Sequence, residues 1–87
     1  MMAQNNYEVA GDLLSAMAWD LRALAEAQVR SLTAMQRCID DFRKSGASDA
    51  ADGILKHIGE IEGRSPHAAE SLRLLRQEVL AASSAPR

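Results

Sequence analysis

The sequence is poor in the residues that usually mark catalytic or metal-binding sites. Its 87 residues include one cysteine, two histidines and three aromatic side chains. The single Cys38 excludes an internal disulfide and any cysteine metal cluster, and it suits a reducing compartment. There is no glycine-rich phosphate loop, no nucleophile elbow and no Cys/His constellation. We therefore expect a protein that is not an enzyme and that uses no cofactor and no metal.

The few titratable candidates are spaced so that they do not converge. His57 and His67 belong to different predicted helices, and neither has a second ligand at metal-binding spacing on its own face. Asp40 and Asp41 point ~100° apart because they are adjacent on a helix. A solvated polar flank explains His57, and surface pairs at i,i+4 with Lys44 and Arg37 explain Asp40 and Asp41. The position of Cys38 at the edge of an apolar stripe indicates a buried structural thiol.

No charge of one sign dominates the chain. Ten basic and twelve acidic side chains give a net charge of −2, which argues against the basic footprint of a nucleic-acid-binding protein. Residues 54–76 could form a helix-turn-helix with Arg64, Arg73 and Arg76 on phosphates. The acidic residues among these arginines would repel phosphates, so nucleic-acid binding is the weaker hypothesis.

Long hydrophobic runs are also missing. Residues 1–6 are polar and carry neither a basic region nor an apolar core, so we expect no signal peptide. The uncharged run around residues 13–19 is far too short to span a bilayer. The sequence therefore predicts a soluble cytoplasmic protein without a transmembrane segment.

Helix breakers are scarce in the first half, and this predicts one long helix over about 6–44. Asn5 with Glu8 forms a capping-box start, and Gly46 follows as a left-handed stop. The predicted apolar stripe consists of Ala10, Leu14, Met17, Leu21, Leu24, Ala25, Leu32, Met35, Ile39 and Phe42. A heptad counted from Leu14 passes through Gln28 and Ser31, so the stripe is polar at its middle.

Two shorter helices are predicted after Gly46, at about 49–62 and about 66–82, and residues 83–87 are expected to fray. Ser65 and Pro66 give the second of them an N-cap and a first helical position. No segment alternates with a period of two residues. The predicted fold is all-α, a single domain over 1–87, in which the long helix folds back against the two short ones as a helical hairpin or bundle.

A second face of the long helix predicts a partner-binding surface. Its members are small residues around the one tryptophan: Ala16, Ala23, Ala27, Ala34 and Trp19. Two plainer explanations remain open, because alanine favours any helix and Trp19 could lie on a neighbouring helix of its own chain. A helix too long for its own small core, together with this face, predicts an oligomer, most simply a homodimer.

The run from Asp20 to Phe42 resembles the Ala-, Leu-, Glu- and Gln-rich helices of phasins, the amphipathic proteins that coat polyhydroxyalkanoate granules. The resemblance implies binding to a granule or lipid surface, although the second half is broken more than a phasin helix would suggest, by Gly53, Gly59, Gly63 and Pro66. The predicted hairpin and its size are also similar to small chaperones of type III secretion systems. Neither resemblance assigns a functional residue.

Two functions therefore remain. The first is a helical protein-interaction module, such as an adaptor, chaperone or regulator, that binds a protein or itself. The second is a phasin-like coat on a granule or lipid surface. Acidic and basic residues alternate on the polar face of the long helix, whereas helices that lie on lipid are usually rich in Lys and Arg there. This alternation favours the protein-interaction module.

Overall fold

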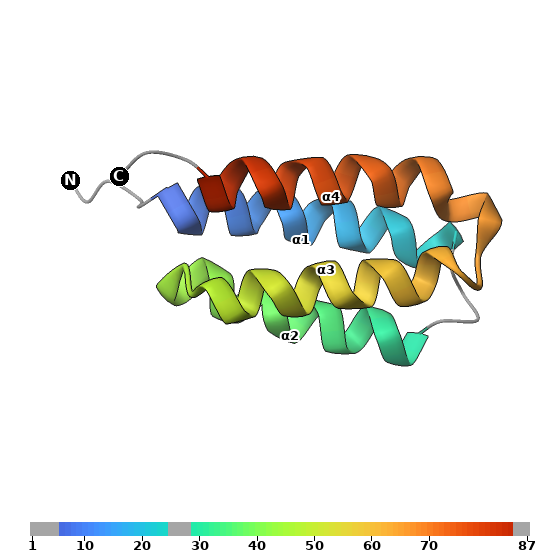
Figure 1. The fold of residues 1–87 in the computed structure, drawn as a ribbon, viewed down its shortest axis with the longest axis horizontal. Coiled ribbons are helices and arrows are strands. Elements are labelled where there is room, and N and C mark those ends of the chain that lie inside the picture. The colour runs from blue at the N-terminus through green and yellow to red at the C-terminus, as the bar shows by residue number, and fades with distance from the viewer. Residues whose placement is uncertain (1–5, 25–28, 85–87) are drawn as a thin grey trace.

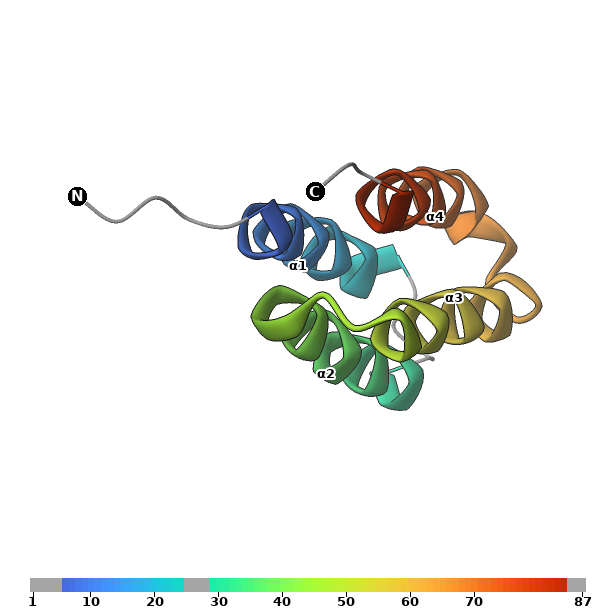
Figure 2. The same ribbon diagram turned by 60° about the vertical axis from the view of Figure 1, so that its left-hand side comes forward.

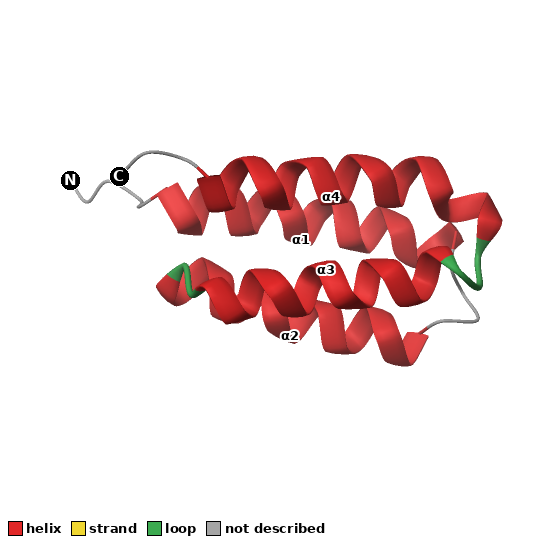
Figure 3. Ribbon diagram, viewed as in Figure 1, coloured by secondary structure: helices red, strands yellow, loops and turns green. Residues whose placement is uncertain are grey.

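The computed structural model describes residues 6–24 and 29–84 of the chain. Its elements are α1 (Asn6–Leu24), α2 (Val29–Ser45), α3 (Ser48–Glu62), the short 3-10 helix η2 (Pro66–Ala68) and α4 (Ala69–Ser84) (Figure 1). No residue within these ranges is in a β-strand (Figure 3). For the described residues, the predicted all-α class is confirmed.

The α-helices of the described part form an up-down-up-down bundle. Helix α1 packs against α2 and α4, and α3 packs against the same two helices. Figure 2 shows the resulting square, with α1 and α3 at opposite corners. The bundle measures 41 × 22 × 19 Å, so each helix has an inner face toward the bundle axis and an outer face toward solvent.

One apolar core runs along the bundle axis. It consists of Leu14, Ala18, Leu21, Leu32, Met35, Ile39, Phe42, Ala50, Ala51, Ile54, Ile58, Ile61, Ala68, Leu72, Leu75 and Val79. These residues recur every three or four positions, so each helix turns one stripe inward. Within the described ranges no polar or charged residue is buried, and the interior therefore offers no concealed reactive group there.

The prediction of one helix over 6–44 is wrong. The rings of Tyr7 and Phe42 make an edge-to-face contact with centroids 5.6 Å apart. An ion pair of 2.9 Å joins Asp12 to Arg43. In a straight helix, Tyr7 and Phe42 would be on the order of 50 Å apart. Helices α1 and α2 are instead separate and antiparallel.

The reason for this error lies in residues 25–28, which are outside the described residues. Their sequence, Ala-Glu-Ala-Gln, contains only good helix formers and no local stop signal. The polar interruption of the stripe at Gln28 and Ser31 was the available signal. When the chain reverses between Leu24 and Val29, the two halves of the stripe face each other, and such packing supplies most of a helix's stability.

The reversal also removes one reason for expecting a homodimer. Helices α2 and α4 cover the inner face of α1. The described part therefore contains no long helix that extends beyond the helices packed against it. The remaining argument for self-association is the outward side of α1. Leu24, a predicted stripe residue, keeps 49% of its surface in solvent on that side.

The turn between α2 and α3 depends on Gly46, as predicted. Its φ of 64° is left-handed, and its N–H donates to the carbonyl of Phe42 at 2.7 Å. A Cβ at this position would lie 2.5 Å from ring atoms of Tyr7. Glycine is needed here for two reasons, the backbone angle and the close approach of the first turn of α1.

The last helix begins as predicted and ends later. Pro66 opens the 3-10 turn, although the preceding Ser65 makes no side-chain capping bond. Residues 83 and 84, where fraying was predicted, continue α4 beyond its predicted end at 82. The Ser83 hydroxyl donates to the Val79 carbonyl at 2.8 Å, a bond that suits a helical last turn. Residues 85–87 lie outside the described residues.

Candidate interaction surface

Exposed large apolar side chains gather on α1. Trp19 keeps 64% of its surface in solvent, and Val9, Leu13 and Leu24 keep between 47% and 52%. Elsewhere in the described residues, the exposed large apolar side chains are Val29, Leu74 and Leu80. Single exposed leucines are common on protein surfaces, but four large apolar residues on one helix of 19 residues form a feature that needs an explanation.

Helix α1 is apolar on two sides. The inner side places Leu14, Ala18 and Leu21 in the core. The opposite side carries a row of exposed residues, Val9, Leu13, Ala16, Asp20 and Ala23. These positions advance by alternate steps of four and three residues, which keeps them on one face of a helix. We call this set of five residues the outer face of α1. A helix that is apolar on opposite sides is usually covered on both.

A polar edge of α1 lies beside α2. Asp12 binds Arg43 at 2.9 Å, and Ser15 accepts a hydrogen bond of 2.9 Å from the side-chain amide of Gln36. Trp19 comes four residues after Ser15 and so follows on the same edge. The described contact of its ring is with its own helix: the guanidinium carbon of Arg22 lies 5.0 Å from the ring centroid.

The Arg22–Trp19 contact gives the tryptophan a defined position at the surface. A cation over an exposed indole contributes about 0.5–1 kcal/mol. Trp19 is consequently a large apolar surface with one ring face partly occupied and most of its area in solvent. Side chains of this kind are enriched among the residues that dominate protein–protein binding energies.

The structure brings together some of the predicted partner-binding residues and separates others. Ala16 and Ala23 are exposed and lie on the same half of α1 as Trp19. Ala34 is half-buried on α2, so it belongs to a different helix of opposite direction. Ala27 lies outside the described residues. The predicted single row of alanines on one helix is therefore wrong, because the chain reverses in its middle.

Sequence reasoning missed Val9 and Leu13, which are the large apolar members of the outer face. A signal was present, since both residues are apolar and fall away from the predicted stripe. They line up with Ala16 at the same four-and-three spacing that marks a helix face. The signal was missed because the second face was taken to consist of alanines around Trp19.

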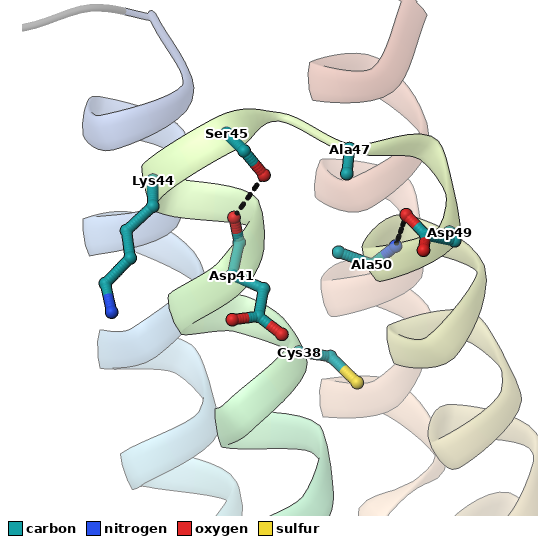
Figure 4. A pocket seen from close by; sticks show the side chains of 7 residues that line it. All are labelled: Cys38, Asp41, Lys44, Ser45, Ala47, Asp49 and Ala50. Atoms are coloured by element: carbon teal, nitrogen blue, oxygen red, sulfur yellow. Dashed lines mark hydrogen bonds between the residues drawn. The ribbon is translucent and has the colours of Figure 1, made fainter.

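Cys38 lines a shallow hollow of about 510 Å³ at the turn between α2 and α3 (Figure 4). Burial, with a smaller effect from the negative charge of Asp41, raises the pKa of the thiol. The sulfur also packs against α3, since a Cβ at Gly53 would lie 2.7 Å from it. Cys38 is half-buried, not buried as predicted, because it lies at the edge of this hollow. The raised pKa keeps its sulfur in the less reactive protonated form.

A second hollow of about 460 Å³ lies at the end of the bundle where α1 begins. Tyr7, Phe42 and Leu80 contribute apolar surface to it, and Ser45 and Ser83 contribute hydroxyls. Both hydroxyls are already bonded to carbonyls of their own helices. Ser48 and Asp52 add a further hydroxyl and a carboxylate to the lining of this hollow.

The predicted polar flanks carry surface contacts. His57 Nδ1 lies 2.8 Å from Glu60 Oε1, one helical turn away on α3. Asp40 accepts a hydrogen bond of 3.1 Å from Gln36. Over residues 6–24 and 29–84, His, Cys, Asp and Glu form no group of three or more that could hold a metal ion.

An ion pair also links two helices on the far side of the bundle. Arg76 of α4 forms a two-pronged contact with the carboxylate of Glu62 on α3. The hydrogen bonds from Arg76 lower the pKa of Glu62. Such a bidentate pair fixes the spacing of two helices more than it adds stability, because both side chains remain about one-third exposed.

Comparison with known protein families, with curated proteins and with solved structures gave no match. The phasin resemblance of residues 20–42 thus stands on the sequence alone. None of the helices in the described part has both the length and the apolar composition needed to cross a membrane.

Proposed function

We propose that this chain is a small, non-enzymatic helical interaction module that works in the cytoplasm as an adaptor, chaperone or regulator of another protein. The observation that carries the proposal is Trp19, which is 64% exposed on a helix whose inner side already supplies the core. Its burial by a partner would remove a large apolar surface from water, and this favours association.

The bundle suits such a role because the proposed binding residues are not needed to complete the core. Leu14, Ala18 and Leu21 anchor α1 from its inner side. The outer face and Trp19 can therefore contact a partner without disturbing the core. Self-association, most simply as a homodimer, belongs to the same proposal, since a second copy presents the same apolar surface.

The test is a comparison of two exposed apolar residues on different helices. Trp19→Ala removes the proposed anchor, and Leu80→Ala, at 48% exposure on α4, is the matched control. Proteins captured by the wild-type chain are first identified and purified, and their affinities for all three chains are then measured. Trp19→Ala should weaken binding by about 30-fold or more, equivalent to about 2 kcal/mol. Equal effects of the two substitutions would contradict the proposal.

A phasin-like coat on a granule or lipid surface is the second candidate. Val9, Leu13 and Leu24 favour it, because exposed apolar residues on one helix can also rest on a lipid surface. The acidic Asp20 within the outer face disfavours it. Flotation with anionic and neutral vesicles separates the two candidates: the coat predicts binding that Leu13→Asp abolishes, and the interaction module predicts that the chain stays in solution.

A further inference from the structure

The hollow at the end of the bundle where α1 begins is lined by residues of α1, α2, α3 and α4. It lies at the left-hand end in Figure 1, where α1 and α3 begin and α2 and α4 end. The turn contributes small residues at positions 45–48, and large apolar side chains surround them: Tyr7, Phe42, Leu55 and Leu80. The volume of about 460 Å³ falls within the roughly 300–1,000 Å³ of sites for small organic ligands.

Tyr7 forms an aromatic wall whose position is fixed from two sides. A Cβ at Gly46 would lie 2.5 Å from its ring atoms, so the ring packs directly against the backbone of the turn. The ring also meets Phe42 edge to face, with centroids 5.6 Å apart. An aromatic ring held in this way attracts a cation that lies over its face.

The serine side chains of the lining are mainly acceptors of hydrogen bonds. The hydroxyls of Ser45 and Ser83 donate to carbonyls one turn earlier on their own helices, at 2.9 and 2.8 Å. Because the single proton of each is engaged, each oxygen can only accept a further bond. The hydroxyls of Ser48 and Tyr7 can donate or accept. The hollow therefore offers more acceptors than donors.

The one charged side chain among the described residues of the lining is the carboxylate of Asp52. It forms no hydrogen bond or ion pair within the part of the chain that the structure describes. Lys56, one turn further along α3, is exposed and does not pair with it. Lysine, arginine and histidine are absent from the described lining, so its negative charge is not compensated there.

The helix ends around the hollow do not reverse this charge. Helices α1 and α3 begin here, and each has an acidic residue in its first turn, Glu8 and Asp49, which offsets the positive N-terminus. Helices α2 and α4 end here, and the negative end of a helix favours cations. The basic residues in the last turn of α2 lie elsewhere, since Arg43 binds Asp12 and Lys44 lines the other hollow.

We infer that this hollow binds a small organic cation, a protonated amine or a quaternary ammonium ion on an apolar body. The body lies between Leu55 and Leu80, and the cationic head lies against Asp52 and the ring of Tyr7. The serine oxygens accept hydrogen bonds from a protonated amine. Trp19 is roughly 18 Å further along α1 than Tyr7, so this site is additional to the proposed function and does not depend on it.

Three compounds with similar apolar bodies and different head groups test the inference. Phenethylammonium is cationic, phenethyl alcohol is neutral and hydrocinnamate is anionic at neutral pH. Each is titrated into the isotope-labelled full chain, and the amide signals are followed by NMR. Phenethylammonium should bind with a dissociation constant of roughly 1 mM, as expected for so small a ligand, and should shift the amides of residues 45–48 and Asp52. The alcohol should bind about 3-fold or more weakly, and hydrocinnamate should bind least.

A pair of charge-removing variants locates the cationic head. Asp52→Asn keeps the shape of the side chain and should weaken the binding of phenethylammonium by about 2- to 5-fold, with no effect on the alcohol. Asp49→Asn is the matched control, because Asp49 carries the same charge near the start of the same helix and lines the other hollow. An asparagine side chain can still accept the bond of 3.1 Å that Asp49 accepts from the N–H of Ala50. The control should bind all three compounds as wild type does.

Equal binding of phenethylammonium and the alcohol, or tighter binding of hydrocinnamate, overturns the inference, and this comparison needs only the wild-type chain. Shifts that do not saturate by tens of millimolar, or that centre on Trp19 rather than on the turn, also overturn it. An equal loss of binding in the two variants does the same. The proposed function would survive each of these results, because its test is the binding of a purified partner to Trp19→Ala.

Discussion

Two glycine-to-alanine substitutions should change stability in opposite directions. Gly46 has a left-handed φ of 64°, and a Cβ there would meet the Tyr7 ring at 2.5 Å. Alanine costs about 1–2 kcal/mol in that backbone region before any crowding is counted. Gly59 lies within α3, and a Cβ there would have no neighbour within 4 Å, so alanine should stabilise the helix by about 0.5–1 kcal/mol.

Urea unfolding followed by circular dichroism measures both effects. The two variants should differ by at least about 2 kcal/mol in the free energy of unfolding, or about 1 M or more in urea midpoint. Gly59→Ala should be more stable than wild type and Gly46→Ala less stable. Two variants that change stability in the same direction would refute the assignment of one glycine to a crowded turn and the other to an open helix surface.

A double-mutant cycle extends this test to the contact between the first turn of α1 and the turn between α2 and α3. Without the ring, in Tyr7→Ala, the substitution Gly46→Ala should keep its backbone cost and lose the crowding cost. The two substitutions should therefore couple by about 0.5–3 kcal/mol. Strict additivity would mean that Tyr7 is far from Gly46, as in a single continuous helix.

Further predictions concern the surface, the ion pair and the thiol. Trp19→Ala should lower association by ~2 kcal/mol or more but alter the melting temperature of a dilute sample only slightly; a large loss of fold stability would place Trp19 in the core. Arg76→Gln should lower stability at neutral pH by about 0.2–1 kcal/mol. Because the pKa of Glu62 is lowered in the folded state, that contribution is present above the unfolded pKa and disappears as the pH falls through the folded pKa; a difference from wild type that persists in acid would contradict the pairing. Cys38 should react with iodoacetamide more slowly in the folded chain than in urea, because burial raises the pKa of its thiol; equal rates would show an accessible thiolate.

Much of the fold follows from local sequence signals, and its main error follows from a missing one. Gly46 and Pro66 each combine a required backbone angle with a break in apolar periodicity, so the helix boundaries near them were predictable. The reversal between α1 and α2 has no glycine or proline to mark it. It is imposed by packing two apolar stripes together, which is a property of the whole chain rather than of residues 25–28.

The interaction surface was predictable in part for a related reason. Trp19 stood out because a tryptophan among charged residues is unusual at any single position. Val9 and Leu13 did not stand out, because an apolar residue is recognised as exposed only once the core-facing side of its helix is known. Ala34 was assigned to the same face as Ala16 by counting about 100° per residue along one continuous helix. That count does not hold across the break between α1 and α2.

Trp19 itself can report whether the outward half of α1 is where this chain associates. It is the only tryptophan in the sequence, so intrinsic fluorescence and its quenching by acrylamide report on this position alone. We expect strong quenching in dilute monomer and progressive protection as the concentration rises through the range in which sedimentation shows assembly, or as a purified partner is added. Quenching that stays the same while assembly or partner binding proceeds would contradict this assignment.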